Sequence, residues 1–325
     1  MRLAARAERW PIAGVFTIAR GSKTEAEVVV VEIEDGARLG RGEATPYPRY
    51  GETTETVLAQ IESVRGAVEA GADRAGLQGL LPPGAARNAV DCALWDVQAK
   101  RTGVPAWSAA GLPRLDPVKT SYTISLAAPE VMAQAARAAA RRPMLKLKIG
   151  AADDLAAVAA VRQAAPKARL IVDANEALAF DDLVRLAPEL ARLDVKLLEQ
   201  PLKVGQDEAL EGYASPVMLC ADESLHTRAE LAACARRYGA VNIKLDKAGG
   251  LTEALALKRE ARAAGLAVMI GCMVATSLAM APALILAQGA DFVDLDGPLL
   301  LATDRSPGLS YQGSVIEPPS PQLWG

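Results

Sequence analysis

Three short apolar stretches recur along the middle of the chain: Met144-Leu-Lys-Leu-Lys148, Arg169-Leu-Ile-Val-Asp173 and Val195-Lys-Leu-Leu-Glu199. Each has the length of a buried strand, and an Ala-rich segment with helical character follows it. The same alternation continues on both sides. Strands are expected at 118–124, 144–149, 169–173, 195–199, 217–222, 241–245, 267–271 and 292–296. Eight strands at intervals of about 20 to 30 residues, with seven helices between them, predict a parallel β/α barrel.

The first part of the chain has a different pattern. A strand is expected over 27–34, followed by an Asp-Gly turn, and helices are expected over 53–70 and 85–96. These elements form an α+β unit of roughly 110 residues. The proline-rich tail after about Ser306 has no barrel element left to form, so we expect it to return to the first unit. The predicted domains are 1–112 together with 303–325, and 113–302.

Charge and length exclude several kinds of partner. The 325 residues include 36 Lys and Arg against 39 Asp and Glu, with no long basic block, which argues against nucleic acid and anionic membrane surfaces. A small-molecule substrate is therefore expected. The charged N-terminal segment lacks the apolar run of a signal peptide, which predicts a cytoplasmic protein. The uncharged stretch 265–290 is interrupted by Gly271 and Pro282, and we interpret it as a buried strand and helix.

The single histidine, His226, narrows the possible chemistry. One imidazole excludes a His-rich zinc site, so acid–base work falls mainly to Lys, Asp and Glu. We expect His226 in a loop or at a helix start. The four cysteines contain no CxxC pair, which favours a reducing compartment and a buried, structural role.

Acidic side chains end three consecutive predicted strands. In a β/α barrel the carboxyl ends of the strands meet at one face, so Asp173, Glu199 and Asp222 would converge there. Three uncompensated carboxylates in a low-dielectric site would cost several kcal/mol each. An oxygen-only set without histidine indicates Mg²⁺, with Mn²⁺ as a substitute. The alternative is that each carboxylate is an ordinary turn or helix-cap residue.

Three lysines stand beside these carboxylates. Lys146 and Lys148 share one face of their strand, and Lys244 approaches from across the barrel. A like charge two residues away and a nearby dication would lower the pKa of a lysine toward the range of a working base. Two opposed lysines could remove a proton from one face of a substrate and return one to the other. The alternative is that they are surface residues.

These motifs resemble the muconate-lactonizing-enzyme-like subgroup of the enolase superfamily over essentially the whole chain. The resemblance implies a modified (β/α)7β barrel behind an α+β capping domain completed by the C-terminal tail. It implies that Asp173, Glu199 and Asp222 bind Mg²⁺, that Lys148 and Lys244 are the acid–base pair, and that Lys146 and Asn175 contact the substrate. The matching motifs are Lys146-x-Lys148, Asp173-Ala-Asn175, Glu199-Gln-Pro, Asp222-Glu-Ser and Asn242-Ile-Lys244.

Within that subgroup, Asp294-x-Asp296 resembles the motif with which dipeptide epimerases bind the substrate α-ammonium group. Two carboxylates at positions i and i+2 of a strand lie on one side and form a cradle for a cation. The likeness extends to epimerases of L-Ala-D/L-Glu, through 16–22, 45–51 and 271–273. Arg20 is the candidate for the glutamate side-chain carboxylate, with Lys23 and Arg49 as rivals.

The resemblance leads to one expected activity and leaves alternatives. We expect a Mg²⁺-dependent epimerase that inverts the α-carbon of the C-terminal residue of a dipeptide by two-lysine proton transfer through an enediolate. The setting implied is recycling of cell-wall peptides, and a homo-oligomer is expected. The alternatives are an N-acylamino acid racemase, a cycloisomerase, or a non-catalytic peptide- or metal-binding protein on the same fold.

Overall fold

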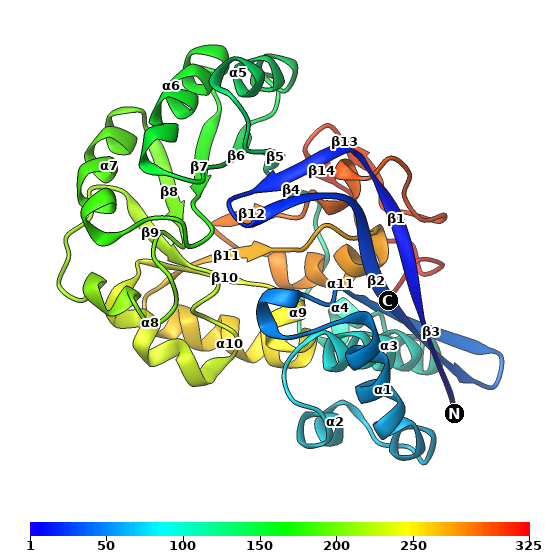
Figure 1. Ribbon diagram of the computed structural model, residues 1–325. Coiled ribbons are helices and arrows are strands. Elements are labelled where there is room, and N and C mark those ends of the chain that lie inside the picture. The colour runs from blue at the N-terminus through cyan, green and yellow to red at the C-terminus, as the bar shows by residue number, and fades with distance from the viewer.

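The computed structural model describes residues 1–325, and a sheet of eight parallel strands forms its centre (Figure 1). Neighbouring strands follow the chain order from β5 to β12. The two ends of the sheet meet, because Ser121 N, just before β5, donates to Val293 O of β12 at 2.8 Å. The predicted barrel is confirmed. Its strands are β5 (Tyr122–Ile124), β6 (Met144–Lys148), β7 (Arg169–Asp173), β8 (Val195–Glu199), β9 (Met218–Ala221), β10 (Ala240–Ile243), β11 (Ala267–Gly271) and β12 (Phe292–Asp294).

Helices cover the outside of the sheet, but not after every strand. The expectation of seven helices between the strands is wrong at one place, since only the short 3₁₀ helix η3 (Asp207–Leu210) lies between β8 and β9. The irregular connection there is stabilised by side-chain hydrogen bonds instead: Asp207 accepts from Ser224 Oγ at 2.7 Å and from Tyr238 Oη at 3.0 Å. The remaining helices of the barrel are α5 (Pro129–Ala138), α6 (Leu155–Ala164), α7 (Phe180–Arg192), α8 (Leu231–Arg237), α9 (Leu245–Ala248), α10 (Leu251–Ala263) and α11 (Ser277–Ala287), with 3₁₀ helices η2 (Ala152–Asp154), η4 (Arg228–Glu230) and η5 (Gly297–Leu300).

The first expected barrel strand, 118–124, is two strands in the structure. β4 (Val118–Lys119) leaves the barrel and pairs with β14 (Val315–Ile316), which forms a hairpin with β13 (Tyr311–Gln312). The strands separate at Thr120 and Ser121, where the backbone changes partner: Thr120 N donates to Ser314 O of the tail, and Ser121 N donates to Val293 O of the barrel, both at 2.8 Å. The tail therefore contributes two short strands as well as its contacts with the N-terminal unit.

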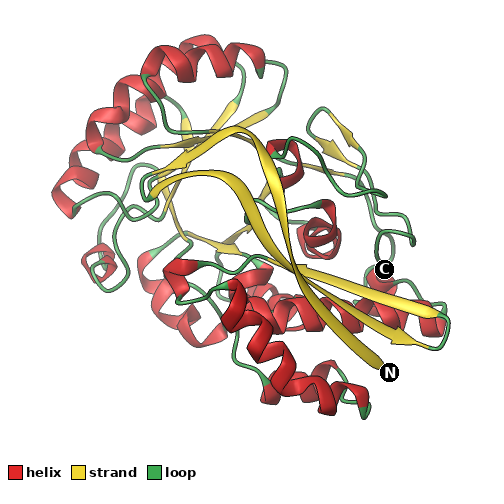
Figure 2. Cartoon of the chain, turned by 45° about the vertical axis from the view of Figure 1, so that its right-hand side comes forward, coloured by secondary structure: helices red, strands yellow, loops and turns green.

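The N-terminal unit has one long strand that the sequence did not reveal. β1 (Arg2–Ile18) pairs with β2 (Gly21–Asp35), and β2 pairs with β3 (Arg38–Ala44). β1 carries charged residues typical of an edge strand: one side pairs with β2, and the other is paired only near Ile12, which bridges to Leu301. Figure 2 shows β1 and β2 curving away from their helices and across the barrel. The helices of this unit are η1 (Pro48–Tyr50), α1 (Thr54–Glu69), α2 (Arg74–Leu80), α3 (Ala85–Thr102) and α4 (Ala106–Ala109).

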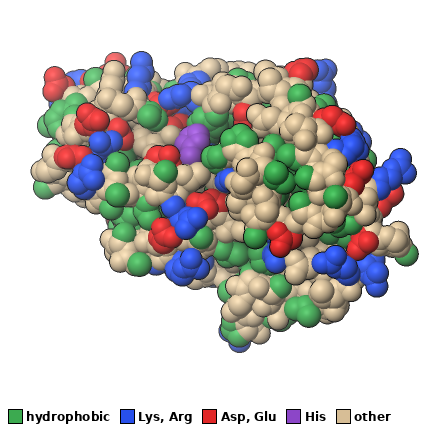
Figure 3. All heavy atoms as spheres, turned by 90° about the horizontal axis from the view of Figure 1, so that it is seen from below, with side chains coloured by type: hydrophobic (Ala, Val, Ile, Leu, Met, Phe, Trp, Pro, Cys, Tyr) green, Lys and Arg blue, Asp and Glu red, His purple; other side chains and the backbone are tan.

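Burial explains the uncharged stretch near the C-terminus. β11 and α11 occupy it, and every residue of α11 is buried, as expected for a helix packed on the barrel and covered on its other side. No helix in the structure combines the length and the apolar character needed to cross a bilayer. On the face shown in Figure 3, basic and acidic side chains are interspersed, so this face carries no large patch of one sign.

The C-terminal residues pack on α3. Trp324 is buried, and its indole Nε1 donates to Cys92 O at 3.1 Å. Gly325 N donates to Asp96 Oδ1 at 2.8 Å, while Arg41 of β3 donates to Leu323 O at 2.8 Å. The last residues of the chain thus complete the packing of the N-terminal unit.

Candidate active site

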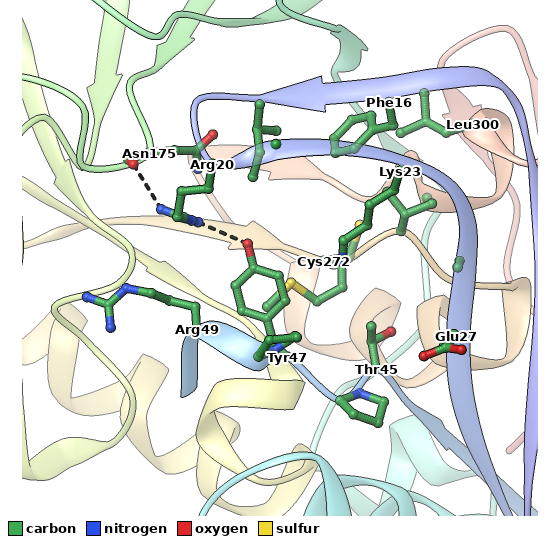
Figure 4. Close-up of a pocket in the computed structure, with 18 of the residues that line it drawn as sticks. Phe16, Arg20, Lys23, Glu27, Thr45, Tyr47, Arg49, Asn175, Cys272 and Leu300 are labelled. Atoms are coloured by element: carbon green, nitrogen blue, oxygen red, sulfur yellow. Dashed lines mark hydrogen bonds between the residues drawn. The ribbon is translucent and has the colours of Figure 1, made fainter. Parts of the chain in front are cut away.

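A cavity of about 910 Å³ lies between the N-terminal unit and the carboxyl ends of the barrel strands. The end of the β1–β2 hairpin and the loop around η1 form one wall, and the strand ends form the floor (Figure 4). Eight of the ten candidate residues line it: Lys146, Lys148, Lys244, Asp222, Asp294, Asp296, Arg20 and Asn175. The other two, Asp173 and Glu199, lie immediately below and are fully buried.

The three strand-end carboxylates come together through the sheet register. Asp173 of β7 lies opposite Glu199 of β8, and Asp222 directly follows β9. In the structure lysine ammonium groups, rather than each other's oxygens, are their close neighbours, and no three acidic side chains stand at metal-ligating distances. Lys148 Nζ lies 2.6 Å from Asp173 Oδ2, and Lys244 Nζ lies 2.7 Å from Asp222 Oδ2.

The Lys146 ammonium is enclosed by carboxylates. Its Nζ lies 2.7 Å from Glu199 Oε2, 2.8 Å from Asp294 Oδ2 and 3.2 Å from Asp173 Oδ2. Burial alone would lower the pKa of Lys146, but the coulombic attraction of Asp294, Glu199 and Asp173 raises it well above the ordinary value. Lys146 is therefore a fixed cation in this arrangement.

Ion pairs with the carboxylates also control the charge of Lys244. Burial opposes that charge, yet the attraction of Asp222 and Glu199 outweighs burial and the repulsion from Lys146, so the pKa of Lys244 is raised. β6, which carries Lys148, and β10, which precedes Lys244, are four strands apart, so the two lysines approach the cavity from opposite sides.

The carboxylates respond unequally to this charge arrangement. Burial, followed by repulsion from Asp173, raises the pKa of Glu199 to about 7. Burial also opposes ionisation of Asp173 and Asp222, but the adjacent lysines dominate and lower the pKa of both. Asp173 and Asp222 are thus held as anions, and Glu199 is the carboxylate whose negative charge is least compensated by its neighbours.

The oxygen chemistry of this set fits a hard divalent cation. All three side chains are buried, none is a nitrogen or sulfur ligand, and Glu199 Oε2 accepts no hydrogen bond of ordinary geometry despite its contact with Lys146. A buried carboxylate oxygen in that condition is costly unless a cation compensates it. Asp173, Glu199 and Asp222 are the residues that could hold Mg²⁺ here.

Three further buried residues fix the positions of Glu199 and Asp222, and the sequence did not single them out. Asn242 Nδ2 donates to Glu199 Oε1 at 2.8 Å. Gln200 Oε1 accepts from Asp222 N at 2.8 Å, and Lys247 Nζ lies 2.6 Å from Asp222 Oδ1. Their places in the sequence are the signal that could have found them. Gln200 directly follows Glu199, Asn242 lies two residues before Lys244 on the same strand face, and Lys247 lies one helical turn after Lys244.

Asp294 and Asp296 differ in their partners. Asp294 is bound by Lys146 and by Ser121 Oγ at 2.5 Å, and although burial opposes ionisation, Lys146 lowers its pKa. Asp296 accepts only from Thr123 N, at 2.6 Å, and it has no cationic partner in the chain. Burial and repulsion from Asp294 raise the pKa of Asp296 to about 7. The cavity therefore contains one carboxylate that an external cation would satisfy.

Arg20 is already satisfied by the protein. Its guanidinium lies 2.7 Å from Glu223 Oε1 and 3.3 Å from Glu176 Oε2, and it donates to Asn175 O at 2.9 Å (Figure 4). Arg49 is likewise paired with Glu176, at 2.7 Å. Asn175 Oδ1, in contrast, is buried in the cavity wall without a hydrogen-bond partner.

Lys23 is the third candidate for the distal carboxylate, and it is free. Its side chain extends from the hairpin into the cavity in Figure 4, with Nζ 5.2 Å from the centre of the Tyr47 ring. It forms no ion pair or hydrogen bond within the chain, and partial burial lowers its pKa.

His226 lies in the loop before η4, as expected. Its ring packs edge-on against Tyr50, with 4.4 Å between ring centres, on the wall of a smaller cavity of about 340 Å³ behind η1. It contacts none of the lysines or carboxylates described above through a hydrogen bond, which agrees with a structural position.

Comparison with known protein families shows to which family the chain belongs. Residues 1–111 match the mandelate racemase/muconate lactonizing enzyme N-terminal domain, and residues 130–298 match the enolase C-terminal domain-like family. The chain belongs to the mandelate racemase/muconate lactonizing enzyme family of the enolase superfamily.

Characterised relatives include two that act on glutamate derivatives. The L-Ala-D/L-Glu epimerase of Escherichia coli (strain K12) is 48% identical over 306 residues, which cover 94% of this chain and 95% of that protein. The N-acetyl-D-glutamate racemase of a Pseudoalteromonas species is 42% identical over 300 residues, 92% of this chain and 95% of that protein.

Solved structures show the same fold with ligands. An enolase family member from Agrobacterium tumefaciens, with homology to dipeptide epimerases and bound sodium and L-Ala-L-Glu, is 53% identical with a TM-score of 0.98 over 99% of each chain. The dipeptide epimerase from Enterococcus faecalis, complexed with Mg and L-Leu-L-Tyr, is 30% identical with a TM-score of 0.90, covering 98% of this chain and 97% of that one.

Proposed function

We propose that this chain is a Mg²⁺-dependent dipeptide epimerase that inverts the α-carbon of the C-terminal residue, with L-Ala-D/L-Glu as its substrate. One observation carries the proposal: lysines on opposite sides of the barrel open into the same cavity as Asp296, a buried carboxylate without a cationic partner. The lysines suit proton transfer at a carbon between them, and the carboxylate suits a substrate ammonium group. The relatives that act on L-Ala-D/L-Glu and the solved complex with L-Ala-L-Glu support the same substrate.

Lys148 and Lys244 are the proposed acid–base pair. Because they approach from opposite sides, one amine can take the α-proton from one face while the ammonium of the other returns a proton to the opposite face. Lys146, which its carboxylate neighbours keep charged, would hold the terminal carboxylate of the dipeptide. Asn175, whose Oδ1 has no partner, is free to accept from a substrate N–H.

Asp173, Glu199 and Asp222 are the proposed Mg²⁺ ligands. When bound, the ion would neutralise these carboxylates and stabilise the negative charge that develops on the substrate carboxylate as the α-proton leaves. The lysine ammonium groups, freed from Asp173 and Asp222, could then face the substrate.

For the glutamate side chain, the contacts favour Lys23 over Arg20. Arg20 and Arg49 already face protein carboxylates, whereas Lys23 points into the cavity with no partner. An unpaired cation on the hairpin is suited to an acidic side chain at the C-terminal position of the dipeptide.

Lys23→Gln is expected to raise KM for L-Ala-L-Glu by about tenfold, since one charge-assisted hydrogen bond would be lost. The same change should leave kcat/KM for L-Ala-L-Met within about threefold, because a methionine side chain has no charge to bind. Steady-state polarimetry with both dipeptides measures the two effects. An equal loss for both would contradict a role in recognising the acid.

Two other features of the proposal concern the whole molecule. We propose the domain division 1–112 with 303–325, and 113–302, because the tail packs on α3 through Trp324 and Gly325. The biological setting proposed is breakdown of cell-wall peptides in the cytoplasm, which the substrate class supports.

The test of the reaction is solvent exchange. The protein is incubated with L-Ala-L-Glu and Mg²⁺ in D₂O, and the glutamate α-proton is followed by NMR while polarimetry follows the configuration. Loss of the α-proton signal together with a change in optical rotation is expected, and neither should occur with EDTA. Absence of exchange with every dipeptide and N-acyl amino acid would refute the proposal.

A second candidate is racemisation of N-acetylglutamate, favoured by the 42% identical racemase. L-Ala-L-Glu and N-acetylglutamate differ in the group that acylates the glutamate nitrogen. In the dipeptide this group is an alanyl residue with an α-ammonium group, whereas in N-acetylglutamate it is an acetyl group with no charge. Asp294 and Asp296 therefore distinguish them, since an acetyl group offers no cation to either carboxylate.

Asp296 predicts a difference in pH dependence. With its pKa at about 7, the carboxyl group is uncharged below that pH, so attraction for the ammonium group is lost as pH falls. At saturating Mg²⁺, kcat/KM for L-Ala-L-Glu is expected to fall about tenfold per pH unit below 7, and less steeply for N-acetyl-L-glutamate. Asp296→Asn should remove this difference between the two profiles. Superimposable profiles in the unsubstituted protein would contradict the assignment.

A further inference from the structure

Four charged side chains join the two loops of the N-terminal unit to the barrel above the cavity. We name Arg20, Arg49, Glu176 and Glu223 the cap–barrel ion cluster. Arg20 lies at the end of the β1–β2 hairpin and Arg49 lies in η1, whereas Glu176 follows β7 and Glu223 follows β9. The cations thus belong to the N-terminal unit and the anions to the barrel.

Glu176 is the centre of this cluster. Its Oε2 accepts from Arg49 Nε at 2.8 Å and from Arg20 Nη1 at 3.3 Å. Its Oε1 accepts from Arg49 Nη2 at 2.7 Å and from Val204 N at 3.0 Å. One buried carboxylate therefore binds the hairpin, η1 and the loop after β8 together. Fork-like, charge-assisted contacts of this kind are stronger and more directional than ordinary hydrogen bonds.

Arg20 adds a second connection. Besides Glu176 and Glu223, it donates to Asn175 O on the barrel and to Tyr47 Oη at 3.0 Å on the other loop of the N-terminal unit. These partners occupy both terminal nitrogens of the guanidinium, so few donors remain for a substrate carboxylate. The contacts of Arg20 instead join the hairpin to the barrel.

The exposure of the partners shows that the cluster lies at the solvent boundary. The side chains of Arg20 and Arg49 are 26% and 39% exposed, whereas those of Glu176 and Glu223 are 7% and 1% exposed. Buried contacts fix the unit elsewhere, as Arg87 donates to Ala248 O at 2.7 Å. Opening of the ion cluster therefore leaves these buried contacts intact.

The hairpin has an irregular segment at which its end could pivot. β1 and β2 lose their register between Pro11 and Phe16, and Gly14 within that gap has φ of 95°. Residues beyond the gap, including Phe16 and Lys23, line the cavity and pair with each other across the turn. One backbone hydrogen bond, from Leu126 N to Thr17 O at 3.0 Å, joins this end of the hairpin to the barrel beside the ion cluster.

We propose that Glu176 is a positioning residue that fastens the hairpin end and η1 over the substrate by binding Arg20 and Arg49. This inference rests on the proposed function and deepens it, because the fastened segments carry Lys23 and Tyr47 to the substrate side chain. Arg20 acts in the fastening and does not contact the substrate. Loss of Glu176 raises the population of the open state for every dipeptide alike.

Limited trypsin digestion tests the fastening without any activity measurement. The bonds after Arg20 and Lys23 lie at the hairpin end, so cleavage there reports its opening. In Glu176→Gln, fragments 1–20 and 1–23 should appear about tenfold faster by mass spectrometry, with an unchanged thermal midpoint. Glu189→Gln, which removes an exposed ion pair with Arg192 on α7, is the matched control and should cleave at the wild-type rate. Unchanged cleavage in a folded Glu176→Gln protein overturns the proposal.

Kinetics separate fastening from substrate recognition. For Glu176→Gln and for Arg20→Gln, kcat/KM should fall by the same factor with L-Ala-L-Glu and L-Ala-L-Met, because opening precedes any contact with the side chain. A loss confined to L-Ala-L-Glu would overturn the proposal by making Arg20 a substrate contact. If no dipeptide reacts with the unsubstituted protein, the proposed function fails, while the trypsin result still decides whether Glu176 fastens the hairpin.

Discussion

Lys244→Ala is expected to lower the rate of L-Ala-L-Glu epimerisation by about 10³- to 10⁴-fold, because inversion needs a proton donor on the face opposite the base. Lys148 remains on the other side of the barrel and can still remove and return a proton on its own face. The variant should therefore retain α-proton exchange in D₂O for one of the two epimers, without inversion. NMR integration of the α-proton for each epimer, beside polarimetry, separates exchange from inversion.

Lys148→Ala should give the mirror result, with exchange retained only for the other epimer. The matched control is Lys196→Ala, since Lys196 is also a strand lysine but points outward and pairs with Asp194 at the surface. That variant should epimerise at the wild-type rate. Unimpaired inversion in either Lys148→Ala or Lys244→Ala would exclude the two-lysine reaction.

Removal of Mg²⁺ is expected to abolish both exchange and epimerisation, and its addition is expected to stabilise the fold. Asp173, Glu199 and Asp222 face lysines without it, and Glu199 carries a pKa raised to about 7 by burial and by Asp173. A ligand at 100 times its Kd stabilises the folded state by about 2.7 kcal/mol, which calorimetry detects as a higher midpoint.

Glu199→Gln tests whether Mg²⁺ acts through the proposed ligands. The substitution keeps the shape of the side chain and its contact with Asn242, but it removes a ligand charge, so the Mg²⁺-dependent rise in midpoint should shrink together with activity. Gln163→Glu, at an exposed position of α6 that does not line the cavity, provides a control in which charge changes away from the metal site. Full activity in EDTA-treated protein would contradict a metal role.

The barrel and most of its strand ends were predictable from the sequence, because a short apolar run and the helical pattern after it are both visible within a few neighbouring residues. Lys148, Asp173 and Glu199 each terminate a strand of five residues. The structure places them side by side, with Lys148 opposite Asp173 and Asp173 opposite Glu199. The fold class and the family follow from that regularity.

Other features depend on contacts that local patterns do not encode. β1 looks like a charged, irregular segment because β2 is the only strand that pairs along its length. The connection between β8 and β9 has a short 3₁₀ helix in place of an α-helix, and there Asp207 bonds Ser224 and Tyr238 directly. Arg20 stays a prediction for the acidic side chain of a substrate, because an arginine near a site suits a carboxylate. Its partners within the chain, Glu176 and Glu223, lie more than 150 positions away in sequence, and only the structure brings them together.

The contact between α3 and the end of the chain has a consequence for biosynthesis. Asp96 and Gly325 are 229 residues apart, so the surface of α3 that receives Trp324 emerges from the ribosome long before its partner is made. At 5 to 20 residues per second, the interval is about ten to fifty seconds. During that time the face of α3 is open to solvent or to chaperones, and the N-terminal unit reaches its final packing only after Trp324 and Gly325 leave the ribosome.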